Sequence, residues 1–105
     1  MPRILIVDDQ PDALMAARAA LVGAGHSCVL AADGERALEL LAAGGFDVVV
    51  LDPAMPLHDG WPVLAAAGGE LPVVVVSNAP GVGGCLPKPF AAADLVAAVR
   101  TALAG

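Results

Sequence analysis

Short apolar runs alternate along the chain with longer stretches in which apolar residues recur at helical spacing. The runs Ile4 to Val7 and Val48 to Leu51 are continuous. Such runs are typical of strands that are covered on both faces of a parallel sheet. Three further strands are predicted at 27–31, 73–76 and 85–86. The pattern therefore predicts five short strands.

Four helices are predicted between and after these strands. The first begins at Pro11, a favourable residue for a first helical turn, and ends near Gly23. The second is capped by Asp33 and ends at Gly44. The other two are expected over 60–67 and 91–103. Alternating strands and helices predict an α/β fold, a doubly wound parallel sheet with helices on both faces.

Composition narrows the class of protein. A length of 105 residues predicts one domain, residues 1–105, and the formal charge of −6 argues against nucleic acid or an anionic membrane as partner. Prolines interrupt the uncharged stretch 71–87, and Asp8 and Asp9 interrupt any signal peptide, so we expect a soluble, cytoplasmic protein. Cys28 and Cys85 fit no metal or redox spacing and are expected to be small buried hydrophobes.

Charged and hydroxyl side chains follow four of the five strands. Asp8 and Asp9 come after the first strand, and Asp52 comes after the third. Ser77 follows the fourth strand, and Lys88, the only lysine, follows the fifth. Ligands of such sheets bind at the carboxyl ends of the strands. Three converging carboxylates would repel one another unless a hard cation such as Mg²⁺ bound between them.

Ordinary capping is the alternative role for these acids. With Pro11 at the first helical position the cap falls on Gln10, so the pair Asp8 and Asp9 is not needed there. Asp52 directly follows an apolar strand, where a buried carboxylate without a partner would be unfavourable. The joint occurrence of these residues at successive strand ends favours a binding site.

Three motifs resemble those of response-regulator receiver domains. The run Asp52 to Gly60, D-P-A-M-P-L-H-D-G, resembles the D-x-x-M-P-x-x-D-G segment of that family. Val7-Asp8-Asp9 resembles its acidic pair, and Lys88-Pro89-Phe90 its K-P-F turn. The resemblance covers nearly the whole chain in the right order. We therefore expect the flavodoxin-like strand order 2-1-3-4-5 and a phosphoryl-accepting signalling domain of a two-component system.

The resemblance implies a role for each of these residues. Asp52 would be the phosphoacceptor, Lys88 would contact the phosphoryl group, and Ser77 would hydrogen-bond it. The peptide bond before Pro89 would be cis. The implied Mg²⁺ ligands are Asp8, Asp9, an Asp52 oxygen and the carbonyl of Ala54.

The implied donor is the phosphohistidine of a sensor histidine kinase or phosphotransfer protein. The chain would be no enzyme beyond its own phosphorylation and dephosphorylation. An aspartate-nucleophile phosphatase is an alternative, but Ala54 stands where such enzymes place a second aspartate. A flavin or nucleotide site is not favoured, because no phosphate-binding loop follows the first strand.

The chain also departs from the family. Only eleven positions separate Ser77 from Lys88, and we predict that a short Gly/Pro loop replaces the fourth helix. Cys85 replaces the aromatic residue that moves during switching. Asn78 stands where a very small residue is usual, and Pro53 removes a backbone N–H beside the acceptor.

Loss of a helix would expose apolar surface along 73–76. We therefore expect a homodimer or a downstream protein to cover the face of the fourth and fifth strands. An alternative function is that of a non-phosphorylated, receiver-like interaction module. The short connection between the fourth and fifth strands and the presence of Cys85 support this alternative.

Overall fold

The computed structural model describes residues 1–52, 60–67, 71–77 and 86–105. Its elements are β1 (Arg3–Val7), α1 (Pro11–Gly23), β2 (Ser27–Ala31), α2 (Gly34–Ala43), β3 (Val48–Leu51), α3 (Gly60–Ala67), β4 (Val73–Ser77), β5 (Leu86–Pro87) and α4 (Ala92–Leu103). All strand pairs are parallel, and the sheet order is β2-β1-β3-β4-β5. The predicted α/β fold class and the order 2-1-3-4-5 are confirmed.

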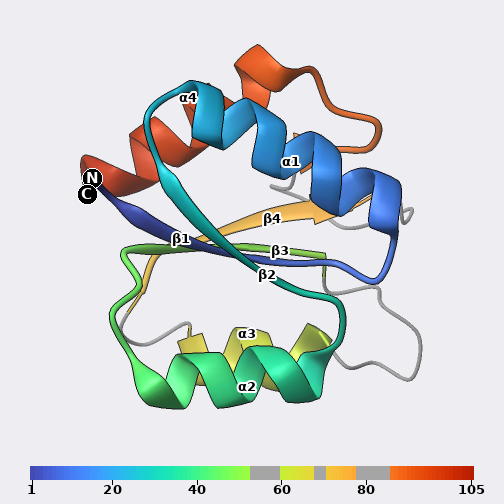
Figure 1. Cartoon of the computed structure of the whole chain (residues 1–105), viewed down its shortest axis with the longest axis vertical. Helices are drawn as coiled ribbons and strands as arrows, with labels where there is room; N and C mark the ends of the chain where they lie inside the picture. The colour runs from blue at the N-terminus through green and yellow to red at the C-terminus, as the bar shows by residue number, and fades with distance from the viewer. Residues whose placement is uncertain (53–59, 68–70, 78–85) are drawn as a thin grey trace.

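Helices cover both faces of the sheet. Figure 1 shows α1 and α4 over one face and α2 and α3 over the other. Alternate side chains of β1 serve the two faces: Ile4 and Ile6 pack with α1 and α4, and Leu5 and Val7 pack with α2 and α3. This two-sided burial explains why the strand is apolar at every inner position.

The inner strands differ in how completely they are covered. Every residue of β3 is buried, whereas in β4 Val73 and Val75 are partly exposed and Val74 and Val76 are buried. Val73 packs against the cluster beneath α2 and α3, and alternation places Val75 on the same face. The apolar surface predicted for β4 is therefore partly open on that face.

Local sequence explains the helix ends. Gln10 occupies the extended cap position before Pro11, as predicted. The Asp33 carboxylate accepts a hydrogen bond of 2.7 Å from the Arg36 amide and so caps α2. Gly44 follows α2 with a φ of 78°, which only glycine adopts readily. The longest described helix, α1, has 13 residues, and among the described residues no helix can cross a membrane.

Four elements have an end that differs by one residue from the prediction. β1 begins at Arg3 rather than at Ile4. β4 runs one residue further, to Ser77, and α4 begins at residue 92, with Ala91 as its cap. β5 is described over Leu86–Pro87 and ends one residue later than predicted, and the predicted start at Cys85 lies outside the described residues. The strand accommodates Pro87 because it lies at the edge of the described sheet, where a missing N–H is tolerated. The predicted loop in place of a fourth helix falls on residues 78–85, which lie outside the described residues.

Candidate functional site

The parallel sheet brings four sequence-predicted residues to one edge. Asp8 follows β1, Asp52 follows β3, Ser77 ends β4 and Lys88 follows β5. Asp8 is 2% exposed, Asp52 is 5% and Ser77 is 2%. Buried polar groups at adjoining strand ends are unusual unless they interact, so this edge is the candidate site.

Backbone hydrogen bonds between neighbouring strand ends fix these positions. The Asp8 amide donates to the Ala31 carbonyl at 3.2 Å, and the Asp52 amide donates to the Val7 carbonyl at 3.1 Å. The Lys88 amide donates to the Ser77 carbonyl at 3.3 Å. The sheet register therefore continues into the site, and each functional side chain starts from an ordered strand end.

The Lys88 ammonium lies between two of the predicted acids. Its Nζ atom is 2.5 Å from Asp8 Oδ2 and 2.7 Å from Asp52 Oδ2, and the three side chains are at most 7% exposed. Burial lowers the pKa of Lys88, but its hydrogen bonds to Asp52 and Asp8 and their charges outweigh burial and raise that pKa above its ordinary value. Lys88 is therefore a fixed cation at neutral pH.

The predicted acidic trio is also assembled. Asp8, Asp9 and Asp52 each offer a carboxylate oxygen, and these oxygens lie within 4.8 Å of one another. Asp9 is more exposed than the other two. Carboxylate oxygens at such separations suit a hard divalent cation, and Mg²⁺ prefers this donor type. The residues present fit the expected metal.

Several predicted site residues cannot be placed. Pro53, Ala54, Asn78 and Cys85 lie outside the described residues. The Lys88–Pro89 peptide bond is described, and it is cis.

The sequence analysis missed one member of the site. Gln10 Oε1 accepts a hydrogen bond of 3.1 Å from Lys88 Nζ, and the backbone N–H of Gln10 donates to Asp8 Oδ1 at 3.0 Å. The only signal for this role was that Gln10 directly follows the acid pair. Its contact with Lys88 spans 78 positions, which no local pattern reveals.

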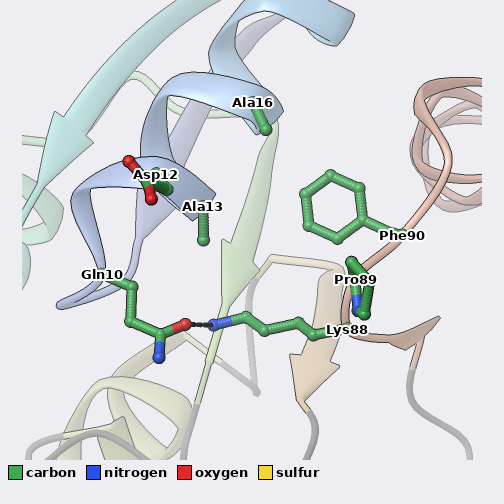
Figure 2. A pocket seen from close by; sticks show the side chains of 7 residues that line it. All are labelled: Gln10, Asp12, Ala13, Ala16, Lys88, Pro89 and Phe90. Carbon is green, nitrogen blue, oxygen red and sulfur yellow. Dashed lines mark hydrogen bonds between the residues drawn. The ribbon is translucent and has the colours of Figure 1, made fainter.

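A cavity of about 400 Å³ opens beside the Gln10–Lys88 contact. Its wall comes from the start of α1 and from the segment after β5, and Figure 2 shows Phe90 and Pro89 facing this part of α1. The lining residues are Gln10, Asp12, Ala13, Ala16, Lys88, Pro89 and Phe90. The cavity therefore lies between the start of α1 and the Lys88 side chain.

Comparison with known proteins agrees with this geometry. A family model for the response regulator receiver domain matches residues 4–100. The response regulator MprA of Mycolicibacterium vanbaalenii is 38% identical over 115 positions, which cover 96% of this chain and 50% of that protein. The chain spans about half the length of the curated relatives it matches. The alignment has 115 positions and this chain has 105 residues, so the alignment places gaps in this chain.

Solved structures show the same similarity. The chemotaxis response regulator CheY4 of Vibrio cholerae superposes with a TM-score of 0.86 at 26% identity, over 98% of this chain and 99% of that one. A putative response regulator from Chloroflexus aurantiacus gives a TM-score of 0.86 at 28% identity, over 100% of both chains. The fold and the motifs point to the same group of proteins.

Proposed function

The chain belongs to the response regulator receiver domain family of two-component systems, and from this premise we propose that Asp52 accepts a phosphoryl group from a phosphohistidine donor. The observation that carries the proposal is the 2.7 Å contact between Lys88 Nζ and Asp52 Oδ2 in a buried site. A fixed cation beside a carboxylate is what phosphoryl transfer to that carboxylate requires.

The reaction follows from the chemistry of the two partners. An Asp52 carboxylate oxygen forms a bond to phosphorus while the phosphorus–nitrogen bond of the donor's phosphohistidine breaks. The imidazole keeps the electron pair of that bond and takes up a proton from water. Lys88 neutralises charge on the incoming group, and Ser77, buried at the neighbouring strand end, is proposed to hydrogen-bond it.

Asp8, Asp9 and Asp52 would hold Mg²⁺, with the Ala54 carbonyl as a further proposed ligand. When bound, the metal neutralises charge on the transferring phosphoryl oxygens. The chain's own part is to hold the acids at adjoining strand ends and to keep the ammonium beside the acceptor.

Response regulators receive phosphoryl groups from histidine kinases, and we propose a sensor histidine kinase or phosphotransfer protein as the donor here. We propose no activity beyond the chain's own phosphorylation and dephosphorylation. On the sequence grounds given above, we place this exchange in the cytoplasm.

A second proposal concerns the face where β4, β5 and α4 meet. A groove of about 450 Å³ lies there, lined by Val73, Val74, Val75, Leu86, Ala98, Thr101 and Ala102. Six of the seven lining residues have apolar side chains, and partly exposed apolar surface of this kind favours a protein partner. We propose that a second copy of the chain or a downstream protein covers it.

Intact mass after incubation with acetyl phosphate and Mg²⁺ tests the proposed acceptor. The wild type should gain one phosphoryl group, and Asp52→Ala should gain none. Asp94→Ala, a change at an exposed acid in the first turn of α4, should leave the gain intact. No gain in the wild type with any donor would favour the non-phosphorylated interaction module.

A further inference from the structure

The Lys88 ammonium has three contacts of different character. An ammonium carries three N–H donors. Among the described residues Lys88 Nζ contacts Asp8 Oδ2 at 2.5 Å, Asp52 Oδ2 at 2.7 Å and Gln10 Oε1 at 3.1 Å. Any new acceptor, such as a phosphoryl oxygen on Asp52, must therefore displace one of these three.

The three acceptors differ in what their release would leave behind. Release of Asp8 would leave a carboxylate at 2% exposure without its cation. Asp52 would be bonded to the phosphoryl group itself, and its second oxygen would remain a hydrogen-bond acceptor for the ammonium. Gln10 is exposed and uncharged, and its contact is the longest of the three. The side-chain amide of a released Gln10 can hydrogen-bond to water instead, so the release costs little free energy. Gln10 is therefore the partner that Lys88 gives up most easily.

The position of Gln10 suits this exchange. It occupies the cap position of α1, yet its side chain makes no capping hydrogen bond to that helix. The backbone N–H of Gln10 donates to Asp8 Oδ1, which holds the backbone beside the site. Its side chain contacts Lys88. Figure 2 shows the Gln10 side chain at the edge of the cavity described above, which gives it room to turn away.

We propose that Gln10 is a positioning residue that holds the Lys88 ammonium in the unphosphorylated state and releases it to the phosphoryl group. The inference rests on the phosphoryl-accepting role proposed for Asp52. Gln10 stabilises only the resting arrangement, so its removal favours the phosphorylated one. A side chain with a merely structural role would have the opposite effect or none.

The first test measures affinity for beryllium fluoride, a noncovalent analogue of the phosphoryl group, in the presence of Mg²⁺. Gln10→Ala should bind the analogue about 3-fold more tightly than the wild type, because a hydrogen bond of the resting state is absent. Asp12→Asn changes a residue that lines the same cavity, and it should leave the affinity unchanged. Equal or weaker binding by Gln10→Ala overturns the inference.

The second test needs neither metal nor phosphoryl donor. Lys88 is the only lysine, so a selectively isotope-labelled lysine ammonium gives one NMR signal. Exchange of its protons with water should be about 3- to 10-fold faster in Gln10→Ala, and Gln10→Glu, which keeps an acceptor oxygen, should restore slow exchange. Unchanged exchange in Gln10→Ala overturns the inference. Failure of the wild type to bind the analogue would instead overturn the proposed function of Asp52.

Discussion

At the scale of single residues, the formal charges of the site explain its need for a cation. The site holds three carboxylates, Asp8, Asp9 and Asp52, and one ammonium, Lys88, which pairs with Asp8 and Asp52, so its formal charge is −2. A divalent cation balances that charge. Lys88 and the metal therefore neutralise the same carboxylates, and each should compensate in part for loss of the other.

Lys88→Met tests this sharing of charge. Without divalent cations the variant should lose about 3 kcal/mol of its free energy of unfolding, because two buried carboxylates lose their partner. Added Mg²⁺ should stabilise the variant more than it stabilises the wild type, as measured by urea unfolding. Arg36→Met breaks only an exposed ion pair, whose side chains are 57% and 59% exposed, and should change little. Equal stability of Lys88→Met and wild type would contradict the prediction.

The pH dependence of stability follows from the same contacts. The folded-state pKa of Lys88 is raised above its ordinary value of 10.5. Its stabilising contribution is therefore complete below the unfolded-state pKa and is lost as pH rises through the folded-state pKa. In chelated buffer, wild-type stability should fall towards that of Lys88→Met above about pH 10. The chain contains no tyrosine, so no phenol titrates in this window. A constant difference between the two proteins up to the highest pH would refute the assignment.

At the scale of elements, the strands and caps that depend on residues close together in the sequence were predicted correctly. The buried strands β1 and β3 and the Asp33 cap rest on local patterns, and all three are confirmed. The ends of β4 and β5 depend on pairing between distant segments, such as Ser77 with Pro87, and were misplaced by one residue. The Gln10–Lys88 contact depends on the assembled sheet in the same way, which is why Gln10 was not among the predicted site residues.

The cap of α2 makes a prediction at this scale. Asp33→Ala removes the acceptor of the Arg36 amide, so the variant should lose about 1 kcal/mol of its free energy of unfolding. Glu39→Ala, on the same helix, removes only the exposed ion pair with Arg36 and should be nearly neutral. Urea unfolding of the two variants measures the difference. Similar losses in both would show that helix propensity, rather than the cap, sets the stability of α2.

At the scale of the whole molecule, the sheet is covered unequally. The chain has eight residues, 78–85, between the parallel strands β4 and β5, whereas a parallel crossover usually takes a dozen or more. Val73 and Val75 are partly exposed on the face of β4 that packs towards α2 and α3. This edge of the sheet is therefore the part of the fold where the described residues leave apolar surface open.

Self-association through this edge is the prediction that follows. Light scattering after size exclusion should show a dimer of the wild type. Thr101→Lys, at an exposed residue of α4 that lines the groove of β4, β5 and α4, should weaken the dimer at least about 10-fold, because its ammonium would be desolvated at an apolar contact. Val22→Lys, at a valine of α1 that is 47% exposed, should leave the dimer intact. A wild type that remains monomeric at high concentration would exclude the second copy and leave a downstream protein as the only proposed occupant of the groove.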